Sequence, residues 1–390
     1  MPIPIVYNVR NVVQRPWTTL ATGWGIAMVV MILVGAFALA SGFQAALVES
    51  GSPDNAIVMR VGADSEISSG VSRDAANIIR ALPDVAPGPD GKPLVSADMV
   101  VLTNLPRIGG SGGTSNVTIR GVDASSFALR GQVKITSGRM FTPGTGEVIV
   151  GRRISTRFRG LALGDRVTFG QQSFAVVGLF SAAGSAFESE IWGDNAVLMP
   201  AFDRTDAFQS VTFRMRNPAQ FEELKKRLQG DPRLGVQVKT ERAFYSEQSR
   251  LLAGMIRAAG VLITLIMAVG AIFGAMNTMY AAVGQRTREI AVLLTLGFSP
   301  GAIMASFMAE SVILCLIGGA LGCLLALPIN GITTSTTNWS SFSEVAFAFR
   351  VTPIGIALGL SFSALLGVVG GFLPARQAAN QPLAGSLRAV

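Results

Sequence analysis

The sequence has 390 residues, of which 49% are hydrophobic and only 14% are charged, and its formal net charge is +8 at pH 7. An average soluble domain carries about 25% charged residues, so this composition indicates an integral membrane protein. The basic excess is spread along the chain and forms no dense patch interleaved with aromatic residues, which argues against nucleic-acid binding. The chain has no histidine, which excludes catalytic and metal sites that depend on imidazole.

The chain begins with an amphipathic segment followed by a long apolar one. Five aliphatic residues between Ile5 and Val13 share one helical face, which predicts a cytoplasmic helix lying in the membrane interface over residues 1–18. Residues 19–41 carry no charge and, as a helix, are long enough to cross about 30 Å of hydrocarbon. Ala38-Leu39-Ala40 also resembles a signal-peptide cleavage site. The apolar core exceeds the usual signal-peptide length of about 7–15 residues, which favours an uncleaved first span.

Residues 42–250 have the composition of an ordinary globular protein and are predicted to form an extracytoplasmic domain. The apolar run 148–151 and the alternating run 166–169, with glycines beside them, are typical of strands. Residues 218–229 carry their apolar side chains on one helical face. Together these patterns predict a mixed α+β fold. A further helical pattern begins at Glu241 and continues without a break into the next apolar segment.

Motifs of common enzymes are either absent or incomplete. Gly109-Gly110-Ser111-Gly112-Gly113 matches the G-x-S-x-G pattern of serine hydrolases, but no histidine is present to act as a base. The Gly91-Lys92 pair is followed by proline, so the phosphate-binding pattern G-x-x-x-x-G-K-S/T is absent. Cys315 and Cys323 lie in one apolar segment, about 12 Å apart along a helix. We therefore predict no catalytic residue and no metal site.

Residues 251–390 contain three more apolar segments, which bring the predicted membrane-spanning helices to four. These segments are 258–282, 303–328 and 353–373. An external loop, residues 329–352, separates the last two, and a cytoplasmic tail, residues 374–390, follows them. The predicted fold class is a membrane protein with four transmembrane α-helices (1 + 3) and a large α+β extracytoplasmic domain inserted between helices 1 and 2.

Arginine residues mark one side of the membrane. They gather at the N-terminus, after the second span and in the C-terminal tail, at Arg10, Arg15, Arg286, Arg288, Arg376 and Arg388, where Glu289 is the one acidic residue. Because positive residues of short loops stay in the cytoplasm, both termini and the 283–300 loop are predicted to be cytoplasmic. The 42–250 domain and the 329–352 loop then lie outside.

Small-residue steps and one charge stand out within the spans. Glycines four residues apart let helix backbones approach closely, and they occur as Gly270/Gly274, Gly318/Gly322, Gly355/Gly359 and Gly367/Gly371. The sequence leaves open whether they pack within the chain or between two protomers. Glu310 is an acidic residue inside an apolar span. Such a carboxylate serves as a proton or substrate site or pairs with an arginine near the cytoplasmic side, and we favour the pair.

Residues 286–297 lie between two spans and are predicted to form a short cytoplasmic helix. No helix breaker precedes Gly297, and the helix would measure about 16 Å, too short to cross a membrane. Its apolar residues therefore have to pack against lipid or a partner protein. The alternative is a simple interfacial turn.

At this point the residues resemble a known family. Residues 277–322, NTMYAAVGQRTREIAVLLTLGFSPGAIMASFMAESVILCLIGGALG, are similar to the C-terminal region of MacB/FtsX-like (type VII) ABC transporter permeases. The ending PARQAANQPLAGSLRAV resembles the end of that family, and EVIVGRRISTRFRGLALGDRVTFGQQSFAVVGLF resembles its periplasmic core domain. The chain departs from the family pattern at Gln285, where an acidic residue is frequent, and at Ala291, where glycine is frequent.

The resemblance implies a permease subunit of the bacterial inner membrane that is not itself an enzyme. ATP and magnesium would be bound by a partner ABC ATPase, which in the family docks on the short cytoplasmic helix. The resemblance carries this docking role to Arg286, Arg288, Glu289, Ile290, Leu293, Leu294 and Gly297. It also implies a second permease protomer, identical or different, contact with membrane lipid and no nucleic acid. A periplasmic adaptor and an outer-membrane channel would be further partners in an efflux system.

Two functions follow from the resemblance. The first is ATP-driven export or extraction of a lipid, lipoprotein, glycolipid or amphipathic drug by mechanotransmission, in which the ATPase moves the external domain. The second is a transmembrane regulator that activates a periplasmic partner, such as a cell-wall hydrolase, without transporting a cargo. The size of the external domain favours export.

Overall fold

The structure, a computed structural model, describes residues 16–109, 113–170 and 172–381. The chain divides into two compact units. The helical unit comprises Met1–Ser41, Gly254–Ile332 and Phe349–Val390, and the α+β unit comprises Gly42–Ala253 and Thr333–Ala348. Residues 1–15 of the predicted interfacial helix, part of the Gly-Ser-Gly run and the end of the C-terminal tail lie outside the described residues.

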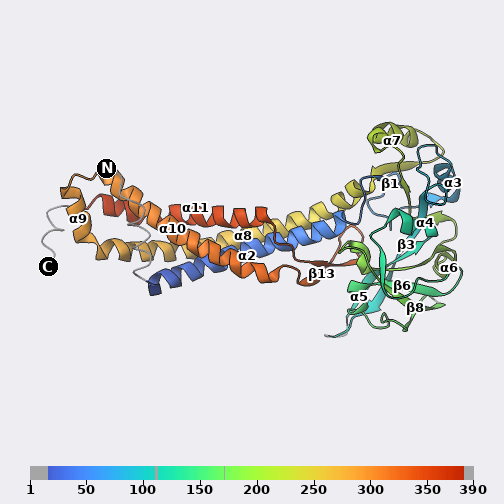
Figure 1. Cartoon of the computed structure of the whole chain (residues 1–390), viewed down its shortest axis with the longest axis horizontal. Helices are drawn as coiled ribbons and strands as arrows, with labels where there is room; N and C mark the ends of the chain where they lie inside the picture. Colours follow the sequence, from blue (N-terminus) through green and yellow to red (C-terminus); the bar gives the residue numbers. More distant parts are fainter. Residues whose placement is uncertain (1–15, 110–112, 171, 382–390) are drawn as a thin grey trace. The chain divides into compact units, whose positions relative to one another are not determined.

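Four of the described helices are long and apolar enough to cross a membrane (Figure 1). They are α2 (Pro16–Val48), α8 (Glu241–Gln285), α10 (Pro300–Ala326, continued by the 3-10 turn η3, Leu327–Ile329) and α11 (Pro353–Ala379). The short helix α9 (Thr287–Thr295) follows α8. With the inserted sheet described below, this arrangement confirms the predicted fold class.

The helix ends differ from the predicted spans because caps and breakers, not hydrophobicity, end a helix. Ser299 caps α10 by accepting a hydrogen bond from the backbone N of Ala302, and Pro300 occupies the first turn, where its missing N–H costs nothing. Thr352 and Pro353 start α11 in the same way. At the other extreme, α2 continues to Val48 and α8 begins as early as Glu241, since neither helix meets a breaker at the edge of its apolar stretch.

Several glycines of α10 and α11 lie against the backbone of a neighbouring helix. A Cβ placed on Gly318 would lie 2.8 Å from the carbonyl O of Gly23 on α2, and one on Gly367 would lie 2.7 Å from the Cα of Val312 on α10. Backbone lies on the other side of both contacts, so only glycine allows this spacing. The buried core between the four helices includes Ile26, Val30, Ala275, Leu314, Cys315 and Leu366.

The remaining predicted packing glycines fall into two groups. Gly322, Gly359 and Gly371 also face neighbouring helices at less than van der Waals spacing for an added Cβ, and Gly355 faces its own cap residue Thr352 at 3.3 Å. Gly270 and Gly274 on α8 have nothing within 4 Å of an added Cβ among the described residues. The structure therefore packs the α10 and α11 glycines within the chain and leaves the α8 pair unpacked.

The α+β unit is built on a ten-stranded mixed sheet in the order β12-β1-β11-β3-β4-β9-β6-β8-β5, with β7 paired to β8. Most neighbours are antiparallel, and the pairs β4–β9 and β6–β8 are parallel. Its strands are β1 (Asn55–Arg60), β3 (Val95–Pro106), β4 (Thr114–Val122), β5 (Lys134–Gly138), β6 (Glu147–Gly151), β7 (Arg166–Phe169), β8 (Gln172–Ser181), β9 (Glu190–Asp194), β11 (Ser210–Arg214) and β12 (Val236–Thr240).

Short helices flank this sheet and complete two hydrophobic cores. They are α3 (Arg73–Arg80), α4 (Ala124–Leu129), α5 (Arg152–Ser155), α6 (Asn195–Ala201) and α7 (Phe221–Gln229), with the 3-10 turns η1 (Ala186–Ser189) and η2 (Pro218–Gln220) and the two-stranded pair β2 (Val71–Ser72) and β10 (Ala207–Phe208). One core lies between α3, α7 and the β12 side of the sheet, and the other lies around β3, β4, β6 and β9.

The predicted external loop 329–352 contains a folded hairpin. Its strands β13 (Thr333–Thr337) and β14 (Glu344–Ala348) pair antiparallel and belong to the α+β unit. Glu344 forms an ion pair with Arg107 at 2.5 Å, and the backbone N of Ala346 donates to Ser189 Oγ at 2.8 Å. The hairpin is therefore grouped with the α+β unit and not with the rest of residues 251–390, because contacts with Arg107 and Ser189 join it to that unit.

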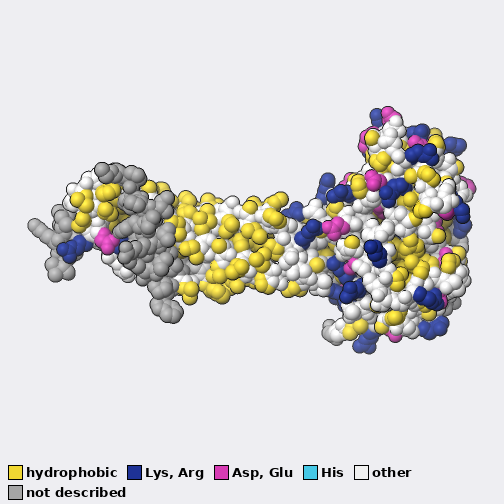
Figure 2. Space-filling model, in the orientation of Figure 1, with side chains coloured by type: hydrophobic (Ala, Val, Ile, Leu, Met, Phe, Trp, Pro, Cys, Tyr) yellow, Lys and Arg dark blue, Asp and Glu magenta, His cyan; other side chains and the backbone are white. Residues whose placement is uncertain are grey.

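The surfaces of the two units differ in character. Figure 2 shows hydrophobic side chains over the helical unit and many charged side chains over the α+β unit. On α8 alone, Leu262, Ile266 and Phe273 are each at least 60% exposed. Apolar side chains exposed to this extent along a long helix are expected where lipid or another helix surrounds it.

Candidate functional site

The short helix α9 is the first candidate site. Gly297, with φ of +89°, ends it, since glycine adopts this left-handed conformation without strain. One face of α9 packs inside the helical unit. Ile290 is only 1% exposed and joins an apolar cluster with residues of α8, α10 and α11, namely Met279, Val283, Ile303, Phe307, Ala375 and Ala378.

A buried ion pair attaches the start of α9 to α10. Arg286 Nη1 lies 2.9 Å from Glu310 Oε2, and the two side chains are 6% and 7% exposed. The space around the pair measures only about 10 Å³, which is the lower limit for one water molecule. Of the two readings of Glu310, the structure shows the pair with an arginine near the short helix.

These contacts place two of the predicted docking residues on the inward side of α9. Arg286 and Ile290 are buried within the helical unit. Leu293 and Leu294 are half-buried against the same cluster, and Gly297 lies in the turn. The sequence placed all seven residues on one docking segment because it showed their helical spacing but not which side of the helix faces the bundle.

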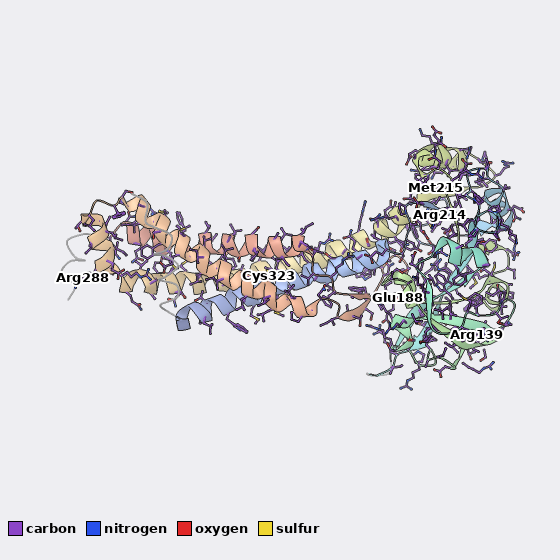
Figure 3. The ribbon with its side chains drawn as sticks, viewed as in Figure 1. Arg139, Glu188, Arg214, Met215, Arg288 and Cys323 are labelled. Atoms are coloured by element: carbon purple, nitrogen blue, oxygen red, sulfur yellow. The ribbon has the colours of Figure 1, made fainter. Side chains whose placement is uncertain are left out.

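The opposite side of α9 is exposed. It consists of Arg288, Glu289, Val292 and Leu296, which we call the outward face of α9. Val292 is 44% exposed and Leu296 is 70% exposed, and Figure 3 labels Arg288 at this end of the helical unit. Two apolar side chains flanked by an arginine and a glutamate form a small surface suited to a protein partner.

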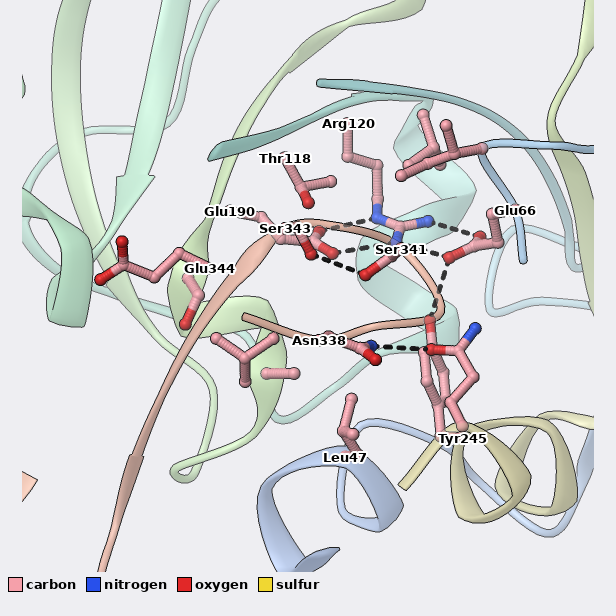
Figure 4. Close-up of a pocket in the computed structure, with 16 residues that line it drawn as sticks. Leu47, Glu66, Thr118, Arg120, Glu190, Tyr245, Asn338, Ser341, Ser343 and Glu344 are labelled. Carbon is pink, nitrogen blue, oxygen red and sulfur yellow. Dashed lines mark hydrogen bonds and ion pairs between the residues drawn. The ribbon is translucent and has the colours of Figure 1, made fainter. Parts of the chain in front are cut away.

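A second candidate site is a buried cluster of charged residues in the α+β unit. Arg120 on β4 donates from Nη1 and Nη2 to Glu66 at 2.9 Å each and from Nε to Glu190 at 2.8 Å (Figure 4). Arg130 at the end of α4 lies 2.8 Å from Asp98 and 3.5 Å from Glu241. We call these six residues the charge cluster; both arginines are 1% exposed.

Burial and pairing with arginine shift the pKa values of the carboxyl groups of this cluster in opposite directions. Burial by itself would raise the pKa of Glu66, but the charge of Arg120 and its hydrogen bonds outweigh burial and hold the pKa at about 2. For Glu241 burial dominates, and its pKa is raised despite the nearby Arg130. Two arginines face four carboxyl groups, so the cluster is compensated only in part.

The charge cluster fixes the start of α8 in the α+β unit. Glu241, the first residue of α8, accepts hydrogen bonds from the backbone N of Ser52 at 3.0 Å and from Asn55 Nδ2 at 2.9 Å. A Cβ on Gly51 would lie 2.6 Å from the carbonyl of Glu241, so the chain leaving α2 and the chain entering α8 touch through a glycine. The start of α8 is thus held by charge and by close packing.

The cavity beside the cluster is too small for a cargo. It measures about 40 Å³ and is lined by Arg120, Glu190, Tyr245 and the hairpin loop around Ser341 (Figure 4). A water molecule needs about 10–15 Å³ of such space, so the cavity suits a few waters at most. Within the described residues no group of three or more potential metal-ligating side chains is found either. The cluster is therefore a structural joint.

Sequence reasoning missed the charge cluster altogether. Asp98 and Arg120 each lie within a strand whose neighbours are apolar, and that pattern is a usable signal of a buried charge. The signal does not name the partner, because Arg120 is 54 residues from Glu66 and 70 from Glu190.

Comparison with known proteins decides the family. A model described as the MacB-like periplasmic core domain matches residues 19–231, and one described as the FtsX-like permease C-terminal domain matches residues 261–383. The chain belongs to the MacB/FtsX-like ABC transporter permeases. The predicted family is confirmed, and the protein is a multi-pass membrane permease of this family.

Relatives of this permease carry related names. A macrolide export ATP-binding/permease protein MacB 1 of Aeromonas hydrophila is 27% identical over 283 residues, which are 67% of this chain and 42% of the relative. An uncharacterized ABC transporter permease YknZ of Bacillus subtilis is 25% identical over 68% of each chain. The chain thus spans less than half the length of the MacB relative.

Among solved structures, the periplasmic region of MacB from Actinobacillus actinomycetemcomitans aligns with this permease at 16% identity and a TM-score of 0.37. The alignment covers 51% of this chain and 94% of that structure.

Proposed function

We propose that this chain is the permease subunit of an ABC transporter and that a partner ATPase docks on the outward face of α9. ATP hydrolysis by that partner moves α9 and the helices attached to it, and this motion is transmitted to the α+β unit, which moves in turn. The transported class is amphipathic: a lipid, lipoprotein, glycolipid or amphipathic drug is exported or extracted from the membrane. The observation that carries the proposal is the two-sided burial of α9, anchored within the helical unit on one side and exposed on the other.

The two family models match permease domains, and the 390 residues contain no phosphate-binding loop, so the proposal places ATP binding in an ATPase domain outside these residues. The relative YknZ, which matches over 68% of its length, is named as a permease alone. ATP and magnesium accordingly bind the partner, and the partner lies on the cytoplasmic side with both termini of this chain, as the arginine distribution predicts.

An unbroken helix supports transmission of motion. α8 runs from Glu241 to Gln285, about 68 Å, and only Arg286 separates it from α9. Its first residue, Glu241, belongs to the charge cluster and accepts hydrogen bonds from Ser52 and Asn55. Because no flexible loop interrupts α8, a displacement of α9 is transmitted along α8 to its first residue, Glu241.

A second permease protomer fits the exposed side of α8. Gly270 and Gly274 form a small-residue step with no neighbour within 4 Å of an added Cβ among the described residues, and Phe273 between them is 64% exposed. Helices pack closely in membranes through such steps. We propose that the protomers of a homo- or heterodimer meet here.

The docking proposal is tested with a charge placed on the outward face. The tagged full-length chain is purified from its native membranes in mild detergent, and the co-purifying subunit is identified by its Walker A sequence and by ATP hydrolysis. Leu296→Asp is expected to reduce recovery of this subunit at least tenfold, because a desolvated carboxylate would face the interface. Leu293 is a poorer choice, since it packs inward and its substitution would also disturb the fold.

Val61→Asp is the matched control. Val61 is 62% exposed and belongs to the α+β unit, and it therefore receives the same chemical change at similar exposure away from α9. Recovery of the ATPase with this variant should equal that of the wild type. Equal recovery with Leu296→Asp and Val61→Asp would show that α9 is not the docking helix.

A further inference from the structure

The helical unit contains an apolar groove among α2, α8 and α11. It measures about 310 Å³, and its lining residues are Leu33, Phe37, Val261, Thr264, Leu265, Leu358, Ser361, Phe362 and Leu365. No lining residue is charged, and the hydroxyl of Thr264 already donates to the carbonyl O of Gly260 at 2.7 Å. The groove therefore offers its occupant van der Waals contact with apolar side chains.

The dimensions fit a single hydrocarbon chain. From Leu358 to Leu365 the groove runs about 10 Å along α11. An extended acyl chain is narrow enough to lie along this length. A helix about 10 Å across is too wide to enter the groove and would reach it only with its side chains.

Two arginines flank one end of the groove. Arg257 lies four residues before Val261 on α8, which places it on the same helical face one turn beyond the groove. The backbone N of Arg350 donates to the carbonyl O of Ala38 at 3.1 Å, next to Phe37 of the lining. Arginine side chains at the end of a membrane span extend to the headgroup region and attract phosphate.

We propose that the groove binds one acyl chain of an anionic phospholipid, with the headgroup phosphate at the Arg257 and Arg350 end. The groove holds the acyl chain against three helices that contact one another. This lipid therefore stays bound to the protein, whereas the annular lipids around the helical unit exchange. This inference requires only that the helices span a membrane and does not rest on the docking of an ATPase.

The test uses the full-length chain in vesicles of phosphatidylethanolamine and phosphatidylglycerol. A trace of phosphatidylglycerol with a diazirine in one acyl chain is activated by light, and adducts are mapped by mass spectrometry. Leu265 lines the groove and is 52% exposed, whereas its neighbour Ile266 lies about 100° further around α8, does not line the groove and is 66% exposed. We expect at least five times more adducts at Leu265 than at Ile266.

Two variants separate the parts of the proposal. Ser361→Trp fills the groove and should lower adducts at Leu265 at least fivefold while leaving those at Ile266 unchanged. Arg257→Gln combined with Arg350→Gln should remove a preference of at least threefold for the phosphatidylglycerol probe over a matched phosphatidylethanolamine probe. If the tryptophan variant does not fold, the wild-type ratio of adducts at Leu265 and Ile266 still tests the groove, and the arginine variant still tests the headgroup preference.

Three results would overturn the proposal. Equal labelling of Leu265 and Ile266 means that only annular lipid is present. Background labelling at Leu265 together with clear labelling at Ile266 means that protein and not lipid fills the groove. A Leu265 preference that is the same for both probes refutes the anionic headgroup at the arginine end.

Discussion

Breaking the Arg286–Glu310 pair should destabilise the helical unit strongly. The perturbation is Glu310→Gln, which keeps the size of the side chain and removes its charge. Arg286 is 6% exposed and the cavity around the pair is about 10 Å³, so water can hardly replace the lost carboxylate. The guanidinium would be left buried with its main ionic partner removed.

The magnitude follows from the geometry. With 2.9 Å between Arg286 Nη1 and Glu310 Oε2, the Coulomb attraction is about 6 kcal/mol at an effective dielectric constant of about 20. Desolvation costs several kcal/mol per ion, so the intact pair contributes little net stability. Removing one partner leaves the desolvation of the other uncompensated, and the free energy of unfolding is expected to fall by about 3–5 kcal/mol. Arg286→Met should cost about as much.

A double-mutant cycle measures this interaction. The free energy of unfolding is determined by titration with SDS in mixed micelles for both single variants and for Arg286→Met with Glu310→Leu. The double variant should be close to the wild type, because an apolar pair of similar volume replaces the ion pair. Arg288→Gln, on the exposed side of α9, is the control and should change stability by less than about 0.5 kcal/mol. Single losses below about 1 kcal/mol that add in the double variant would refute this account.

Three further predictions concern packing, pH and the hairpin. Gly318→Ala should destabilise the helical unit by about 1–3 kcal/mol through overlap with the backbone of α2, whereas Gly25→Ala on α2, with nothing within 4 Å of the added Cβ among the described residues, should not destabilise it; thermal unfolding of the purified variants compares them. Since the pKa of Glu66 is lowered from 4.5 to about 2 in the fold, its stabilisation of about 3 kcal/mol is fully present above pH 4.5 and is lost as the pH falls toward 2. Urea unfolding across this range should show the loss in the wild type and not in Glu66→Gln. Glu344→Gln should raise amide exchange in residues 333–348 at least about tenfold by releasing the hairpin, and unchanged protection there would mean that its ion pairs do not anchor it.

The sequence by itself determined the membrane character and the order of elements. Four long apolar segments, the α+β domain inserted after the first and the short helix after the second could all be predicted, because hydrophobicity and periodicity are local properties of the chain. The start of α8 at Glu241 was also predicted, whereas α2 extends to Val48, well beyond its apolar stretch, since helices end at caps and breakers and not where hydrophobicity falls.

Only the tertiary structure decided which side chains meet. The helical spacing of residues 286–297 is visible in the sequence, but that Arg286 and Ile290 turn inward depends on Glu310, 24 residues away, and on the packing of three other helices. The hairpin that joins the α+β unit, the charge cluster around Arg120 and the groove beside Leu265 likewise depend on contacts between distant segments. The cost of burying a charge or the gain from close packing is set by those neighbours, and a local pattern cannot identify them.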